Sequence, residues 1–222
     1  MLIAARNAIL AGAALPYDAE VDYLESTGTQ WIDTGVVGTS ALEVDIRIYS
    51  PNQDSNSKCP IGNFDNSTGV AIRDSLLVNS DAKYYYYFGS LLGTQGNYIP
   101  FNQWIKFTLG LSAKWEGETS GEGTYTPPFS GAFSTTVSLT LFCRHVNNNS
   151  SIYTDAAWTG KISHCAISEG SSLVRDFIPV RVGSGASAVG YMYDRVSGEL
   201  FGNAGTGAFV IGPDASAANG GV

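Results

Sequence analysis

The chain has 222 residues, and its 12 Lys and Arg against 20 Asp and Glu give a formal net charge of −8. Binding to nucleic acid or to an anionic membrane surface requires clustered cations, so this charge balance excludes both partner classes. The 44% hydrophobic content excludes intrinsic disorder, and no apolar run reaches the roughly 18 residues needed for membrane insertion.

Residues 1–20 are predicted to form an apolar helical segment that docks the chain to other subunits. The i, i+3, i+4 spacing of one helix face is followed by Leu2, Ile3, Arg6, Ile9 and Leu10, of which all but Arg6 are apolar. A helix this short is marginal in isolation, so the apolar face predicts a partner surface. A secretory signal peptide and a frayed extension are the alternatives, although a signal would carry its positive charge ahead of the apolar stretch.

Residues 21–213 are predicted to form a single all-β domain, followed by a flexible tail at 214–222. The clearest strand is 42–49, where apolar and polar residues alternate strictly, as in a sheet with one wet face. Further strands are predicted at 104–111, 137–144, 160–167, 173–180 and 189–194. Many short strands with one-sided patterning favour an antiparallel two-sheet jelly-roll sandwich.

The three cysteines, Cys59, Cys143 and Cys165, are expected to be small buried side chains. An odd count cannot form a complete disulfide framework, and a chain of this size does not need one. His164 and Cys165 are adjacent on a predicted strand and point to opposite faces, which argues against a shared zinc ion.

Both ends of the predicted domain carry long motifs. The segment 23–35 reads YLESTGTQWIDTG, and the segments 173–179, 190–201 and 203–207 read LVRDFIP, GYMYDRVSGELF and NAGTG. These motifs resemble the laminin-G-like, concanavalin A-like lectin-glucanase jelly-roll family of gut bacteria and their bacteriophages. The resemblance implies a concanavalin A-like jelly roll, whereas the middle of the chain, about 50–155, matches only as a pattern of strands.

The motifs also have a direct physical interpretation. Their glycines are expected at tight turns with positive φ or at close backbone approaches: Gly28, Gly35, Gly198, Gly205 and Gly207. The charged residues at strand ends are expected to be hydrogen-bonded structural groups: Arg175, Asp176, Asp194 and Arg195.

No enzyme activity is predicted. Glycoside hydrolases of this fold carry Glu-x-Asp-x-x-Glu on one strand, and retaining chemistry needs the two outer carboxyls roughly 5 Å apart. Glu43 and Asp45 begin this pattern, but Ile48 stands where the second glutamate is needed. Arg47 is expected to pair with Asp45 or Glu43 and hold it ionised, which is the opposite of what a proton donor requires.

The run from Tyr84 to Tyr87 is the most conspicuous candidate binding feature. Faces alternate on a strand, so two of the four tyrosines, Tyr84, Tyr85, Tyr86 and Tyr87, should point outward and could stack on sugar rings. Tyr98 and Trp115, in or beside predicted loops, are secondary candidates. The alternative is a tyrosine ladder packed under a loop or against another subunit. Asn- and Asp-rich loops could offer oxygens to calcium, but no EF-type spacing occurs, so no cofactor is predicted.

Three function classes remain open. The first is a non-catalytic lectin-like module displayed on a phage particle, as a fibre or decoration protein that contacts host-surface glycan. The second is a structural virion protein without a ligand, and the third is a secreted or cell-surface bacterial adhesin domain. The negative charge favours neutral over anionic glycans.

Overall fold

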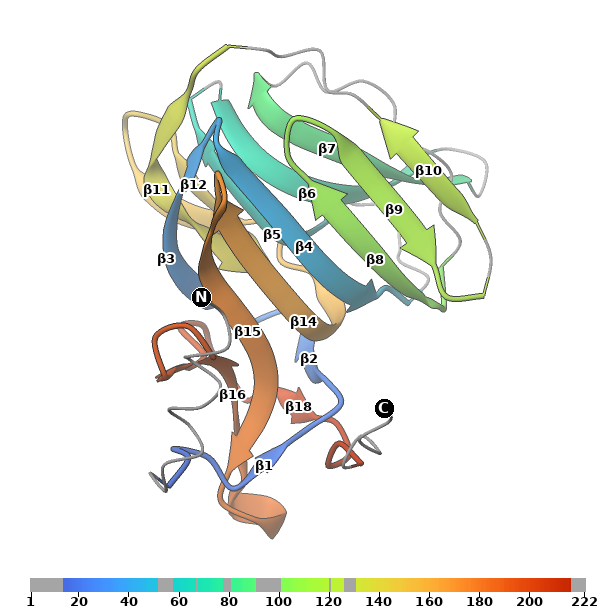
Figure 1. Cartoon of the computed structure of the whole chain (residues 1–222), viewed down its shortest axis with the longest axis vertical. Helices are drawn as coiled ribbons and strands as arrows, with labels where there is room; N and C mark the ends of the chain where they lie inside the picture. The colour runs from blue at the N-terminus through green and yellow to red at the C-terminus, as the bar shows by residue number, and fades with distance from the viewer. Residues whose placement is uncertain are drawn as a thin grey trace.

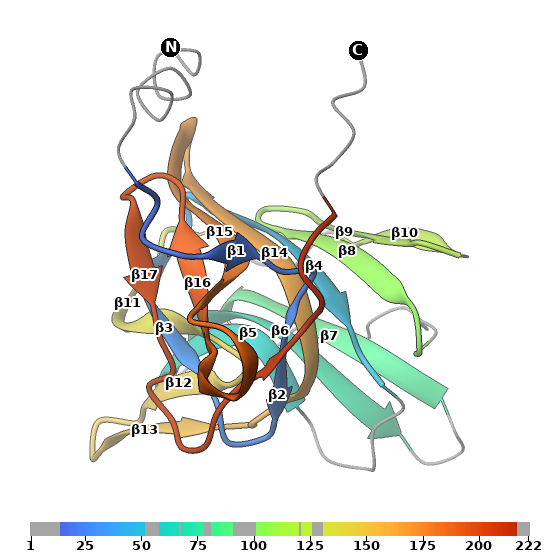
Figure 2. The same cartoon turned by 90° about the horizontal axis from the view of Figure 1, so that it is seen from below.

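The computed structural model describes residues 14–51, 58–66, 68–77, 81–90, 101–119, 121–125 and 131–216, which form two β-sheets packed face to face (Figure 1, Figure 2). Within these residues the larger sheet has eleven strands, eight of them in the order β10-β9-β8-β4-β14-β15-β16-β17. β1, β2 and β18 pair alongside this path. The bounds are Ala19–Glu20 (β1), Leu24–Thr27 (β2), Leu42–Tyr49 (β4), Trp104–Leu109 (β8), Ala113–Gly117 (β9), Glu122–Tyr125 (β10), Thr159–Glu169 (β14), Ser172–Val182 (β15), Val189–Asp194 (β16), Glu199–Phe201 (β17) and Val210–Ile211 (β18).

The smaller sheet has seven strands in the same part of the chain: Ile32–Thr39 (β3), Lys58–Asp65 (β5), Thr68–Leu77 (β6), Asp81–Ser90 (β7), Ser134–Leu141 (β11), Arg144–Asn147 (β12) and Ile152–Asp155 (β13). β11 runs antiparallel to β5 and turns back after Leu141, so β12 returns parallel to β5. The other pairs of this sheet are antiparallel. The predicted two-sheet antiparallel sandwich is confirmed apart from the β5–β12 pair.

The core lies between the two sheets and follows the alternation predicted from the sequence. On β4 the apolar side chains are buried, and the residues between them face outward. The largest fully buried side chains include Trp158, Phe107, Phe142 and Phe177, drawn from both sheets and their connections. Each large apolar side chain removed from water contributes roughly 1.5–3 kcal/mol, so this layer holds the sheets together.

The predictions for the cysteines and the motif glycines are confirmed. All three cysteines are free and buried. Cys165 packs in the core, whereas His164 beside it bonds to Asp176 on the outer face. Gly28, Gly35, Gly198 and Gly207 adopt positive φ, which other residues rarely adopt.

The predicted N-terminal helix and its docking residues, Leu2, Ile3, Ile9 and Leu10, fall within 1–13 and lie outside the described residues. β1 pairs with β15, Val21 bridges to Asp214, and the Ala215 amide donates to the Glu20 carbonyl at 2.9 Å. The described helical structure is a 3₁₀ turn at Gly185–Ser187. No helix in the described ranges has the length and apolar character required to cross a membrane.

Candidate functional site

Two of the predicted ligand-binding residues lie in the core, so those predictions are wrong. Tyr86 is 1% exposed and packs against Phe107, with ring centroids 6.0 Å apart. Its partner across the strand pair is the buried Ile72, which fixes the inward face of β7 at this point. Trp115 is 5% exposed, because it lies on the inward face of β9 and not in a loop.

Of the other predicted aromatic residues, Tyr87 has a described side chain. Tyr87 is half-buried, and it lies close enough to Arg144 to help raise the pKa of that guanidinium. Tyr84 and Tyr85 belong to β7, but their side chains are not among the described ones, and Tyr98 lies outside the described residues. Sugar binding by Tyr84, Tyr85 and Tyr98 therefore stays a prediction, and the described residues offer a concave surface elsewhere.

A cleft of about 260 Å³ lies where two motif loops meet. The loop leading into β3 and the loop after β17 are hydrogen-bonded to each other like the strands of a short ladder. The amides of Ala204 and Thr206 donate to the carbonyls of Trp31 and Thr29, at 2.8 and 3.0 Å. The Thr29 hydroxyl donates to the Thr206 carbonyl at 2.9 Å. The motifs at the two ends of the domain thus build one wall of the cleft together.

Asn203 fixes the shape of this wall. Its side-chain oxygen accepts hydrogen bonds from the amides of Trp31 (3.1 Å) and Gly205 (2.9 Å), and its amide group donates to the Gly207 carbonyl at 2.9 Å. Gly205 lies so close to the first loop that an added Cβ would be 2.1 Å from the Thr29 carbonyl oxygen and 2.7 Å from the indole of Trp31. Only glycine fits there, as the motif predicted.

β13 and the residues after it also line the cleft. Thr154 and Asp155 share its lining with Trp31 and with the buried Cys143. Arg144 holds the Asp155 carboxylate through two parallel bonds, Nε to Oδ1 at 2.8 Å and Nη2 to Oδ2 at 2.6 Å. A bidentate pair of this kind fixes the carboxylate in one orientation.

The surroundings of Arg144 favour its charged form. The Arg144 side chain is 15% exposed, and its guanidinium lies 5.2 Å from the Phe64 ring centroid. Burial works against the charged form, but the hydrogen bonds and charge of Asp155 raise the pKa of Arg144 above its usual value. Burial also raises the pKa of the Cys143 thiol to about 12, so this group is no nucleophile at neutral pH.

The backbone beneath the cleft is strained. Phe142, next to Cys143, has a φ of 68°, which costs a non-glycine residue about 1–2 kcal/mol. Its ring is fully buried against Phe209 and Trp158, with centroids 5.0 and 6.0 Å away. This packing holds the reversal between β11 and β12, which places Cys143, Arg144 and Asp155 at the cleft. Strained residues are frequent at binding sites, where the surrounding structure maintains them.

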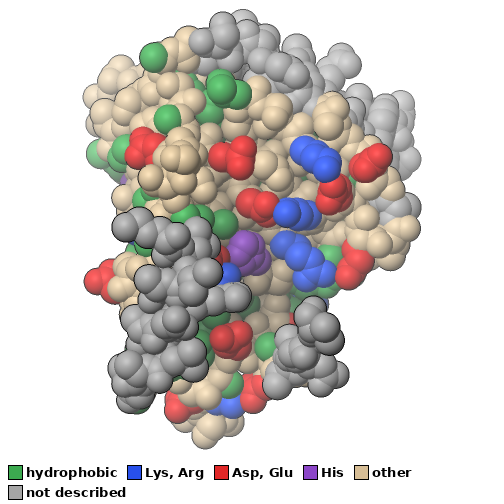
Figure 3. Space-filling view, in the orientation of Figure 1, with side chains coloured by type: hydrophobic (Ala, Val, Ile, Leu, Met, Phe, Trp, Pro, Cys, Tyr) green, Lys and Arg blue, Asp and Glu red, His purple; other side chains and the backbone are tan. Residues whose placement is uncertain are grey.

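The outer face of the larger sheet is the second polar surface, and Figure 3 shows acidic and basic side chains interspersed over it. Asp45 pairs with Lys106 at 2.9 Å, and Arg47 pairs with Glu118 at 3.1 Å while its guanidinium lies 4.5 Å from the Trp104 ring. The expected pairing of Arg47 with Asp45 or Glu43 is therefore wrong, because β8 and the turn after β9 bring other partners closer. These charges neutralise one another on the sheet.

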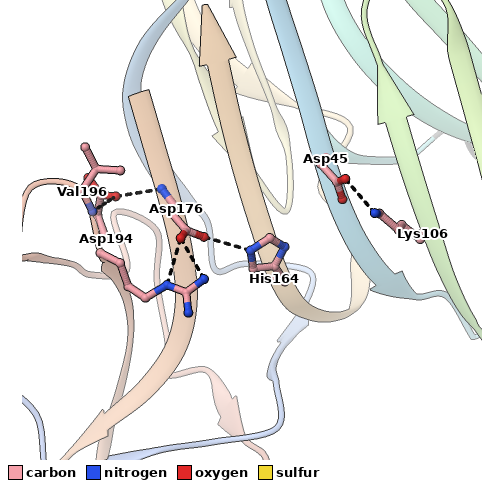
Figure 4. A network of polar contacts seen from close by, with 7 residues as sticks. Asp45, Lys106, His164, Asp176, Asp194 and Val196 are labelled. Atoms are coloured by element: carbon pink, nitrogen blue, oxygen red, sulfur yellow. Dashed lines mark hydrogen bonds and ion pairs between the residues drawn. The ribbon is translucent and has the colours of Figure 1, made fainter. Parts of the chain in front are cut away.

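A hydrogen-bonded network on β14, β15 and β16 adjoins this face (Figure 4). The Asp176 carboxylate binds His164 Nε2 at 2.9 Å and the Arg195 guanidinium at 2.8 and 2.9 Å. Burial opposes its ionisation, but these partners lower the pKa of Asp176 to about 2. Fully buried Asp194 accepts the amides of Asp176, Val196 and Ser197. The prediction that these motif residues are structural polar groups agrees with this arrangement.

Metal ligands do not gather among the described side chains. No group of three or more His, Cys, Asp or Glu residues lies together there. Calcium binding by the Asn-rich loops stays a prediction without a described donor cluster.

The comparisons with known proteins show the fold alone. No family model matches the chain, and no curated protein matches it. Among solved structures, it is similar to a candidate carbohydrate-binding protein from Bacteroides ovatus ATCC 8483, with 8% identity, a TM-score of 0.55, and coverage of 89% of this chain and 61% of that one. The chain thus spans about six tenths of the length of that protein.

Two further structures are more distant. The heptameric SAP-like pentraxin of Limulus polyphemus shares 10% identity over 70% of this chain and 77% of that chain, with a TM-score of 0.46. Scytalido-glutamic peptidase shares 13% identity over 78% and 98%, with a TM-score of 0.44. The architecture common to this chain and the Bacteroides ovatus protein is a jelly-roll β-sandwich.

Proposed function

We propose that this chain is a non-catalytic, lectin-like carbohydrate-binding module whose glycan site is the Trp31 cleft. The observation that carries the proposal is the composition of the cleft, whose lining combines the half-buried Trp31 with the fixed carboxylate of Asp155 and with threonines. The C–H face of a sugar ring packs on an aromatic face, while its hydroxyls need polar partners at the side. The shared fold with a candidate carbohydrate-binding protein supports the same conclusion.

The non-catalytic part rests on the interrupted carboxylate pattern at 43–48, where Ile48 replaces the second glutamate, and the pKa shifts of the acidic groups agree with it. A glycosidase requires a carboxylic acid with a raised pKa as its proton donor. Among the described residues whose pKa the fold shifts, the carboxyls all shift downward. His164 and Arg195 lower that of Asp176, Lys114 lowers that of Glu116, and Arg181 lowers that of Asp214. We expect no release of reducing ends from a panel of mixed β-glucans, and release abolished by Glu43→Gln would contradict this.

A glycan array probed with the full-length chain tests the binding proposal. A single ring contributes on the order of 1 kcal/mol beyond burial, so we expect a weak site, near millimolar or about −4 kcal/mol, which multivalent display makes measurable. Trp31→Ala should abolish binding. Trp104→Ala is the matched control, because Trp104 is also half-buried but lies on the outer face of the larger sheet.

The array has two outcomes that contradict the proposal. Loss of binding in Trp104→Ala with retention in Trp31→Ala would move the site to the larger sheet. If the folded wild-type chain binds no glycan, a structural role without a ligand takes the place of the lectin-like one.

The finer proposal is that the module is displayed on a phage particle, as a fibre or decoration protein, with a secreted or cell-surface adhesin as the alternative. The apolar segment 1–16 and the family resemblance support this setting. Deleting 1–16 should leave the sandwich folded while lowering the oligomeric or particle-bound fraction. Identical light scattering and virion incorporation with and without the segment would contradict it.

A further inference from the structure

We infer that the Trp31 cleft selects neutral sugars with two adjacent free hydroxyls, and that Asp155 is the specificity-determining acceptor. The inference rests on the proposed glycan-binding function and assigns the ligand class of that same site.

The hydrogen-bonding capacity of Asp155 is the first argument. An ionised carboxylate has about four lone-pair positions, and the two bonds from Arg144 occupy one on each oxygen. One further acceptor position on each oxygen is left. The side chain of Asp155 is 33% exposed and lines the cleft, so these positions can be reached by a ligand. Two acceptors at a fixed spacing suit two neighbouring hydroxyl donors.

The charge of the cleft is the second argument. Among the described residues that line the cleft, Asp155 is the charged one. The cation that balances its charge, Arg144, is largely buried. Arg144 is 15% exposed, donates hydrogen bonds from Nε and Nη2 to Asp155, and packs over the Phe64 ring. A ligand carboxylate or sulfate would therefore meet the oxygens of Asp155 and not the guanidinium. The net charge of −8 adds repulsion at longer range.

The size of the cleft is the third argument. At about 260 Å³ it lies below the range of roughly 300–1,000 Å³ typical of pockets for drug-sized ligands. Trp31 lines the cleft beside Gly205, where an added Cβ would be 2.7 Å from the indole. These dimensions suit one terminal sugar unit, with its apolar face on the indole and its hydroxyl edge toward Asp155.

The test is a binding panel on the full-length wild-type chain, read by ligand-observed NMR and by the array. It contains neutral methyl pyranosides, the matching uronic acids, and deoxy analogues that lack one hydroxyl of each adjacent pair. We expect uronic acids to bind at least roughly tenfold more weakly at low salt, with the gap narrowing as salt screens the repulsion. Removing one hydroxyl of the preferred pair should have an effect of similar size.

Asp155→Asn should weaken binding of the neutral sugar and erase the discrimination against uronic acids. Asp45→Asn is the matched control, since Asp45 also pairs with a cation but lies outside the cleft. A thermal melt checks that each variant folds. If Asp155→Asn does not fold, the binding of deoxy sugars and uronic acids to the wild-type chain tests the inference instead. Glycan binding with equal or better affinity for uronic acids would overturn this inference alone. No glycan binding at all would overturn the proposed function, and this inference with it.

Discussion

Asp194→Ala should be among the most destabilising single substitutions in the described sandwich. The side chain is fully buried at the end of β16 and accepts backbone amides at 2.8, 3.1 and 3.2 Å, with the Arg175 guanidinium 3.6 Å away. Alanine leaves the three amides without their acceptor and removes the ion-pair partner of Arg175, which keeps its hydrogen bonds to the carbonyls of Thr34 and Val174. Removing one partner of a buried charged network costs about 3–5 kcal/mol. In a domain of this length, that corresponds to a fall in Tm of roughly 6–20 °C.

The measurement is urea unfolding followed by intrinsic fluorescence, with Asp194→Asn and Asp45→Ala in parallel. Asparagine keeps one acceptor oxygen, so its cost should lie between those of the wild type and the alanine variant. Asp45 pairs with Lys106 on the outer face, where such pairs contribute about 0–1 kcal/mol. If Asp194→Ala costs no more than Asp45→Ala, the carboxylate does not organise the turn after β16, and the reasoning is refuted.

Four features of the structure give further predictions. Asn203→Ala removes the three bonds that clamp the cleft wall and should cost about 2 kcal/mol and abolish glycan binding, measured by urea unfolding and the array. Ala156→Gly should raise the free energy of unfolding by about 0.5–1 kcal/mol, because Ala156 has a φ of 51°, and an equal loss of stability would contradict this. The pKa of Asp176 is lowered to about 2, so Asp176 should contribute up to about 2 kcal/mol to the free energy of unfolding above pH 4, and this contribution should be lost as the pH falls toward 2. The free energies of unfolding of the wild type and Asp176→Asn should therefore converge at low pH. Cys143, whose pKa burial raises to about 12, should resist thiol reagents at pH 8 until the chain unfolds, as mass spectrometry would detect.

Local alternation predicted much of the fold. The strict pattern at 42–49 identified β4 and its buried face, and adjacency placed His164 and Cys165 on opposite faces. The motif glycines were also predictable, because a positive φ is a property of a few neighbouring residues.

Properties that depend on distant residues were not predictable. Alternation in the tyrosine run fixes which residues share a face of the strand. Which of the two faces is buried depends on the pairing of β7 with β6, where Tyr86 lies opposite Ile72 and both are buried. Arg47 likewise pairs with Glu118, 71 residues away, and not with its neighbours on β4.

The cleft was missed for the same reason. Trp31 belongs to the motif that identified the fold, but no residue near it in the sequence indicates that Asp155 lines the same cleft. Asp155 comes to the cleft because it pairs with Arg144 on β12, after the β11–β12 reversal. One usable signal was present, since Trp31 lies three residues after Gly28 in the motif, and aromatic side chains commonly line ligand pockets.

The ladder between the two motif loops has a consequence for how the chain folds. Thr29 and Thr206 are 177 residues apart, and closing a loop of that length costs about 5 kcal/mol in chain entropy alone. Contacts of such high contact order form late, after the more local hairpins have reduced the effective separation. During synthesis, the wall around Trp31 stays incomplete until residues 203–207 have left the ribosome, so an unfinished chain lacks the complete cleft. Under the proposed function, sugar binding by this domain would therefore report that its β-sandwich is complete.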